Sequence, residues 1–309
     1  MSKIIPPRPR YKPERILVGF MALTAFSLLF LYRLLLAKLP FDSRSPLFVL
    51  LLELTVFVVP ATVFILVRGR GYTRALRLRA PEGAHTPLLI AAFFALFSGC
   101  LLLSILFGGN ESLGTSATAF DSATSGALWK RILTMLILAP VPAVAEELFF
   151  RGILVTEYER RGAVRAILLS ALLFALIHFD LQNLPVYLFS GVLFALVLYA
   201  TDSLVATMLL HILYNTTSLI GQEYLNTLYR FTGNIQLFLF LVILIFLGSM
   251  ILLLRGFAKI YKSRHESGVG KPRRDVPYNV QFHTTLDAIR DPAFIVCIIL
   301  GIVGFILLR

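Results

Sequence analysis

The chain has 309 residues, of which 58% are hydrophobic and 15% are charged, and its mean hydropathy is +0.82. A soluble domain is only about 45–50% apolar, and here the excess lies in long runs. The composition therefore excludes an ordinary soluble protein and predicts a polytopic membrane protein. The net charge of +12 does not indicate nucleic acid as a partner, because the basic residues flank apolar runs. We expect these residues to set the topology and to contact anionic lipid head groups.

The apolar runs predict an all-α polytopic bundle of about eight to nine membrane segments. Residues 1–15 are basic, and the first run after them lacks a small-residue cleavage site, so we expect an uncleaved anchor. For the last run, a half-inserted hairpin is an alternative to a full crossing. The runs lie at about 16–37, 47–67, 87–108, 132–155, 163–178, 184–200, 204–220, 235–254 and 293–308.

Basic clusters precede the first run and follow the second, fourth and eighth runs. All of them lie on one side of the membrane if every run crosses once, and that side is the cytoplasm by the positive-inside rule. The pattern predicts a cytoplasmic N-terminus and an outer C-terminus. The membrane would be the plasma membrane if the chain is bacterial.

Cysteines and loop histidines give little indication of chemistry. Cys100 and Cys297 lie within apolar runs, so we expect packing residues and neither a disulfide framework nor a thiolate metal site. His85, His265 and His283 lie in polar stretches, where we expect them to be solvated.

The fourth run carries an acidic pair and an arginine. A charge within the membrane costs roughly 2.5 kcal/mol or more, so a chain that keeps several of them is expected to use them. Glu147 and Arg151 are four residues apart, the favourable spacing for an ion pair along a helix. We predict that this pair supports the structure and that Arg151 reaches toward the cytoplasmic surface. Glu146 then has no local partner, and such a carboxylate suits a general base or acid.

Two prolines precede this acidic pair. Pro140 and Pro142 predict a break or kink about one turn before Glu146, because each removes a backbone donor. Irregular backbone at this depth is tolerated where it lines a cavity, although an ordinary proline kink is the alternative. Glu53, in the second run, is expected to be an interfacial carboxylate near the outer end.

Two later runs carry histidines. His211 and Asn215 are four residues apart and share one helix face, so together they could donate hydrogen bonds to an oxyanion. An interhelical hydrogen-bond clamp is the alternative for this pair. His178 also lies in an apolar run, four residues after Phe174, and we expect Phe174 to pack while His178 supplies chemistry.

These fragments resemble the CPBP (Abi) intramembrane proteases, a family related to the type II CAAX prenyl endopeptidase. The resemblance covers about 130–220 and divides the chain into N-terminal helices at 1–129, a protease core at 130–220, and C-terminal helices at 221–309 with a basic linker at 255–291. The family pattern is matched in order by Glu146-Glu147-x-x-x-Arg151, Phe174-x-x-x-His178 and His211-x-x-x-Asn215.

The resemblance implies hydrolysis of a peptide bond near the membrane. Glu146, helped by His178, would activate a water molecule, and His211 and Asn215 would stabilise the oxyanion. We expect no cofactor, because no His-Glu-x-x-His helix is present. Zinc is the alternative, and its ligands would be Glu146, His178 and His211.

The substrate is expected to be a peptide or a membrane protein, and prenylated only in the eukaryotic branch of the family. One alternative function is a non-catalytic membrane immunity or scaffold protein of the same family. A proton-coupled transporter would also keep buried acids and histidines, but the runs show no duplicated halves.

Overall fold

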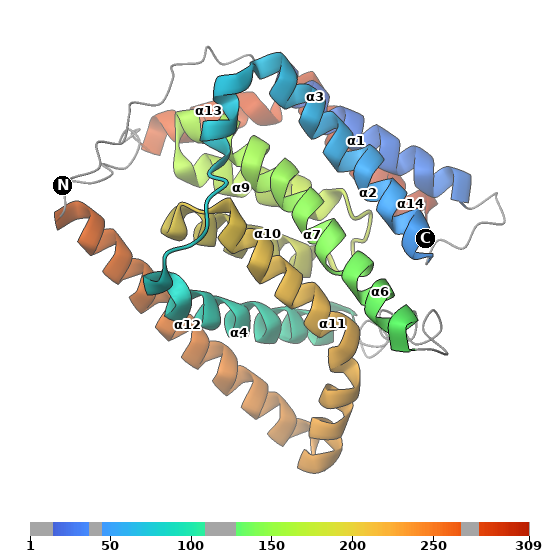
Figure 1. Ribbon diagram of the computed structural model, residues 1–309, viewed down its shortest axis with the longest axis vertical. Helices are drawn as coiled ribbons and strands as arrows, with labels where there is room; N and C mark the ends of the chain where they lie inside the picture. Colours follow the sequence, from blue (N-terminus) through green and yellow to red (C-terminus); the bar gives the residue numbers. More distant parts are fainter. Residues whose placement is uncertain (1–14, 37–44, 109–127, 267–277, 309) are drawn as a thin grey trace.

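The computed structural model describes residues 15–36, 45–108, 128–266 and 278–308. Every regular element in these ranges is a helix, which confirms the predicted all-α class (Figure 1). The N-terminal basic residues 1–14, the loop 109–127, the linker segment 267–277 and the side chain of His265 lie outside the described part. The α-helices are α1 (Arg15–Leu36), α2 (Pro46–Glu53), α3 (Val59–Arg68), α4 (Thr86–Leu103), α6 (Leu128–Leu138), α7 (Pro140–Glu147), α8 (Thr156–Tyr158), α9 (Ala163–Leu176), α10 (Leu184–Thr201), α11 (Leu204–Thr232), α12 (Ile235–Glu266), α13 (Tyr278–Ile289) and α14 (Pro292–Leu307).

Short segments of other helix types join some of these α-helices. Three are π-helical, namely η1 (Leu54–Val58), η4 (Ser104–Gly108) and η5 (Leu148–Val155). Three are 3-10 helices, namely η2 (Arg70–Leu76), η3 (Gly83–His85) and η6 (Glu159–Arg161).

The chain is an integral, multi-pass membrane protein. Seven helical stretches in the described ranges are long and apolar enough to cross a membrane, or eight if the bent pair α13 and α14 is one span. Nine separate crossings are not reached, because α9 has only 14 residues. The helix of the last run meets α13 at an angle of 66°, a bend that fits both a broken full crossing and the hairpin alternative.

Two of the spans are interrupted where the acidic residues lie. In the span Ile132–Arg161 the α-helix stops at Ala139 and restarts at Pro140. The predicted proline break is therefore present, but it lies seven residues before Glu146 and not one turn before it. The π-helical η5, which no sequence signal predicted, begins directly after Glu147. Likewise, η1 begins directly after Glu53 in the span Pro46–Arg68.

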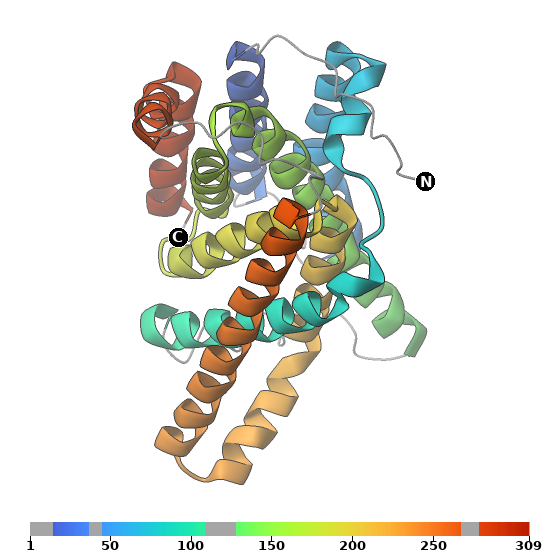
Figure 2. The same cartoon turned by 90° about the vertical axis from the view of Figure 1, so that its left-hand side faces the viewer.

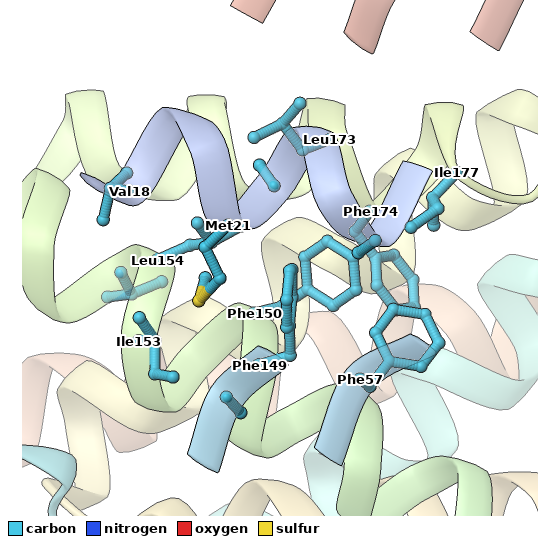
Figure 3. Packing of buried hydrophobic residues seen from close by; sticks show 14 of the residues in the cluster. Val18, Met21, Phe57, Phe149, Phe150, Ile153, Leu154, Leu173, Phe174 and Ile177 are labelled. Carbon is cyan, nitrogen blue, oxygen red and sulfur yellow. The ribbon is translucent and has the colours of Figure 1, made fainter. Parts of the chain in front are cut away.

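These two spans pack side by side and point in the same direction (Figure 1). The ring of Phe57 lies 5.4 Å from the ring of Phe149 and 5.8 Å from that of Phe150. Phe150 in turn meets Phe174 of α9 at 5.1 Å, so Phe174 packs as predicted, and Figure 3 shows these rings within the main apolar core. The aromatic contacts fix the depth at which the two spans meet.

A second apolar cluster holds α4, α10 and α12 together. In Figure 2, α4 crosses α12, while α11 and α12 extend together beyond the other helices. A Cβ atom on Gly99 of α4 would meet Phe189 at 2.6 Å and Phe246 at 2.9 Å. The crossing therefore needs glycine at this position, as is common where membrane helices pack closely. Cys100 lies buried in the same cluster and Cys297 in the main core, both as free thiols, as expected.

The connection between α3 and α4 is held by buried ion pairs. Arg68 donates to Glu157 at 2.6 Å, and Arg77 binds Glu159 and also Asp202, the latter at 2.8 Å. The backbone carbonyl of Arg77 accepts from Leu204 N at 2.9 Å. These contacts join the connection to α8, to η6 and to the turn between α10 and α11. Arg68 and Arg77 are therefore buried, although we expected their basic cluster to contact lipid head groups.

One loop histidine is also not where we expected it. His85 is buried at the start of α4, whereas His283 is exposed as predicted. The reading of His85 as a solvated loop residue was wrong, because the 3-10 turn η3 folds this end of the connection onto the helices.

The buried pairs of Arg77 predict a large effect on stability. Arg77→Gln should lower the free energy of unfolding by roughly 3–5 kcal/mol, because it removes a cation from the buried carboxylate of Glu159. The matched control is Arg74→Gln, an exposed arginine on the same connection. Thermal unfolding of both variants in detergent measures the difference, and equal midpoints would contradict the assignment.

Candidate active site

Glu147 lies at the centre of the polar groups inside the bundle. Its side chain is 0% exposed, and its Oε1 accepts from Arg151 Nη1 at 2.8 Å and from His211 Nδ1 at 3.0 Å. The ion pair predicted from the four-residue spacing is thus present. The carboxylate also binds a second helix, α11, through a residue 64 positions away.

Arg151 is fully buried and does not reach toward the membrane surface, so that expectation was wrong. Its Nη2 donates to the carbonyl oxygen of Gly191 on α10 at 3.2 Å. Its guanidinium carbon lies 4.4 Å from the ring centre of Phe174 and 5.0 Å from that of Phe194. A delocalised cation is well suited to aromatic faces, so this environment stabilises Arg151 where water cannot.

Gly191 allows the backbone to come close to this arginine. A Cβ atom at position 191 would meet the Cα atom of Ala171 at 3.0 Å. Because α9 and α10 touch at this point, the carbonyl of Gly191 lies within reach of Arg151. No sequence signal singled out this glycine, since small residues are common in membrane helices.

His211 links the two glutamates. Its Nδ1 binds Glu147, while its Nε2 lies 3.9 Å from Glu146 Oε2. A carboxylate oxygen only accepts hydrogen bonds, so Nδ1 carries a proton and Nε2 faces Glu146. The ring stacks on Phe194 with centroids 4.6 Å apart, which fixes its plane. The ring is thus oriented by contacts on both its edge and its face.

Glu146 differs from its neighbour in exposure. Its side chain keeps 13% of its accessible surface, whereas that of Glu147 keeps none. The His211 contact at 3.9 Å is longer than a hydrogen bond, so both oxygens of Glu146 can bind another group. Adjacent helix positions point about 100° apart, which explains how one acid is enclosed and the other is accessible.

His178 lies beside the same site but does not touch Glu146. Within the described residues its Nδ1 donates to the carbonyl of Phe174 at 2.7 Å, and its ring stacks on Tyr187 with centroids 3.8 Å apart. The carbonyl can only accept, so the other nitrogen, Nε2, is free to accept a proton. The structure therefore does not bring the predicted pair of Glu146 and His178 into direct contact.

Asn215 lies at the break in the acidic span. Its Nδ2 donates to the carbonyl oxygen of Ala139, the residue between α6 and α7, at 3.4 Å. His211 is one turn away on the same helix, as the spacing predicted. One of the two amide N–H groups is used in this long contact, and the second is available.

The predicted zinc alternative has no matching donor set. Within the described ranges, no group of three His, Cys, Asp or Glu side chains lies close enough to hold a metal ion. Glu146 and His211 are neighbours, but His178 is turned toward Phe174 and Tyr187. Glu146, His178 and His211 therefore do not fit a three-ligand zinc site.

Sequence reasoning missed one acid of this region. Glu53 is only 6% exposed, so it is not an interfacial carboxylate as expected. It belongs to α2, which packs against α7, the helix that carries Glu146. Counting residues from the ends of an apolar run did not reveal this burial, because the burial depends on the facing span.

The geometry agrees with a comparison against families of known proteins. Residues 128–217 match the family model described as type II CAAX prenyl endopeptidase Rce1-like. The middle of the chain is therefore similar to this family of endopeptidases. The match begins with α6 and ends within α11, so it includes Glu146, Glu147, Arg151, His178, His211 and Asn215. Comparisons with curated proteins and with solved structures gave no match.

The match to the Rce1-like family supports the prediction that the chain is a protease-like enzyme within the membrane. The match agrees with the resemblance to CPBP proteases that the sequence indicated over about 130–220. The helix α11 continues past the end of the domain, to Thr232.

The pairing of Glu147 and Arg151 predicts the stability of variants. Arg151→Met should lower the free energy of unfolding by roughly 3–5 kcal/mol, because Glu147 is left as a buried charge without its cation. The double variant Glu147→Gln/Arg151→Met should regain part of this loss. Thermal unfolding of the single and double variants tests this, and strictly additive losses would refute it.

Proposed function

We propose that the chain is an intramembrane endopeptidase in which Glu146 activates the water that hydrolyses a peptide bond. The observation that carries this proposal is the division of roles within the acidic pair. Glu147 is enclosed and bound by Arg151 and His211, whereas Glu146 is partly exposed beside His211. A general base needs a free lone pair within reach of water, and Glu146 meets this requirement.

In the first step, Glu146 takes a proton from water as the oxygen attacks the scissile carbonyl carbon. His178 would help by accepting a hydrogen bond from the same water through its Nε2, since its Nδ1 is already bound to a carbonyl. The carbonyl carbon becomes tetrahedral, and its oxygen becomes an oxyanion. Glu146 then passes the proton to the leaving amine as the carbon–nitrogen bond breaks.

The oxyanion would be stabilised by His211 and Asn215. His211 in its doubly protonated form donates through Nδ1 to Glu147 and presents Nε2–H on the side of Glu146. Asn215 adds its second amide N–H from one turn further along α11. Donors held in place before the reaction stabilise developing charge well, because they need no reorganisation. In this proposal Arg151 and Glu147 act only by holding His211.

The membrane arrangement and partners are also part of this proposal. We infer from the basic clusters that the N-terminus lies in the cytoplasm, and we expect the ion pair of Arg68 and Glu157 on the same side. Arg68 and Arg77 are enclosed, so contact with anionic lipid falls to exposed basic residues such as Arg74 and Lys262. The substrate is a peptide or membrane protein whose scissile bond can reach Glu146.

Replacing the proposed base tests the function directly. Glu146→Gln should lower kcat for cleavage of a peptide by roughly 10²–10⁴-fold, the range for loss of a general base. The variant should still fold, because the pair of Arg151 and Glu147 is kept. Glu82→Gln, an exposed loop acid, serves as the control. Full turnover by Glu146→Gln would show that another group activates the water. Function that survives loss of both Glu146 and His211 would favour the immunity or scaffold alternative.

A chelator separates the glutamate mechanism from a metal-dependent one. Because the described donors do not form a three-ligand set, we expect cleavage to continue after incubation with a zinc chelator. Loss of activity that added zinc restores would overturn the glutamate mechanism while leaving the protease function intact.

A further inference from the structure

Glu53 is an acid whose burial the proposed mechanism leaves unexplained. It is the last residue of α2, it lies deep in the bundle, and its Oε2 has no hydrogen-bond partner among the described residues. A buried carboxyl group without a partner costs free energy, and an apolar residue would avoid that cost. Its presence therefore calls for a role.

The packing of the two broken spans brings Glu53 to the depth of Glu146. Both spans point the same way, and Phe57 meets Phe149 and Phe150. Glu53 comes four residues before Phe57, and Glu146 comes four residues before Phe150, so each acid lies one turn before the contact. Helix α2 also packs directly against α7, which carries Glu146.

The charges around Glu146 agree with this placement of Glu53 at the same depth. Among the described residues, the charged or titratable side chains that act on Glu146 are Glu53, Glu147, Arg151 and His211. Arg151 is already paired with Glu147, so it does not neutralise a further acid fully. Like charges on neighbouring buried carboxyl groups disfavour the doubly ionised state, so a proton on one of the two acids would be favourable.

Both spans change helix type directly after their acids. The π-helical η1 starts at the residue after Glu53, and η5 starts at the residue after Glu147. A π-helical turn redirects the side chains next to it and is frequent at functional sites. The two π-helical segments face each other through Phe57 and the pair Phe149 and Phe150.

We propose that Glu53 is a positioning residue of the active site, a neutral carboxylic acid whose unpartnered Oε2 carries a proton that it can donate in a hydrogen bond to the Glu146 carboxylate during the reaction. This inference rests on the proposed protease function. The proton of Glu53 stays on Glu53 throughout the reaction, while Glu146 takes the proton of water and passes it to the leaving amine. Glu53 therefore acts through Glu146, by keeping it ionised and oriented.

Two substitutions at position 53 separate this role from simple packing. Glu53→Leu should lower kcat at least about tenfold with little change in KM, because the donor to the general base is lost. Glu53→Gln should recover at least about half of that lost rate, because its amide keeps a donor of similar shape. The control is Thr55→Val, which removes a hydroxyl bonded to Leu51 on the same span.

A merely structural carboxyl would give a different result. Leucine at a buried membrane position would then leave kcat unchanged and raise the thermal midpoint. Full kcat in Glu53→Leu, or an equal loss in Glu53→Gln and Glu53→Leu, would overturn the proposal.

A double-mutant cycle of thermal midpoints tests the contact between Glu53 and Glu146 without measuring activity. If the wild type cleaves no peptide, that result refutes only the protease function. Thermal midpoints are compared for Glu53→Leu, Glu146→Gln and the double variant. We expect the two shifts not to add, because each acid acts on the other. The combination of Glu53→Leu with Glu82→Gln should add. Additive shifts for Glu53 and Glu146 would refute the contact itself.

Discussion

The carboxylate of Glu147 is the interaction on which the site depends. It lies in a membrane span, where an unpaired charge would be costly, and it is bound by Arg151 from its own span and by His211 from α11. Arg151 extends the same network to α10 through the carbonyl of Gly191. One buried charge thus ties three segments together and orients the histidine that faces Glu146.

The broken helices make this network compatible with chemistry. A continuous α-helix would satisfy its own backbone and offer little room for a substrate, whereas the break at Ala139 presents a carbonyl that Asn215 reaches. The π-helical η5 then carries Phe149, Phe150 and Arg151 into the core. Aromatic packing after the acids and the break at Ala139 before them hold Glu146 in a position where 13% of its side chain stays exposed.

The sequence predicted the parts of the site that depend on local spacing. The ion pair of Glu147 and Arg151 and the shared face of His211 and Asn215 follow from helix periodicity alone. The all-α class and the membrane segments followed from the apolar runs. The resemblance to a known family grouped the three fragments, and the Rce1-like match over 128–217 agrees with that grouping.

The remaining features depend on contacts between segments that are far apart in the chain. His211 and Glu147 are 64 positions apart, and Arg68 and Glu157 are 89 apart, so neither pairing had a local signal. The burial of Glu53 and of Arg151 depends on which helix faces them. Residue counts from the ends of a run measure depth and not the identity of the neighbouring helix. The π-helical segments have no recognised sequence pattern and could not be predicted.

The tautomer of His211 tests the central claim most directly, because it reports whether Glu147 orients this ring. Nitrogen NMR of isotope-labelled histidine, recorded on the protein in lipid and assigned with a His211→Gln variant, measures which ring nitrogen carries a proton. The account predicts a proton on Nδ1 of His211, weakened or lost in Glu147→Gln. An Nδ1 without a proton in the wild type would contradict it.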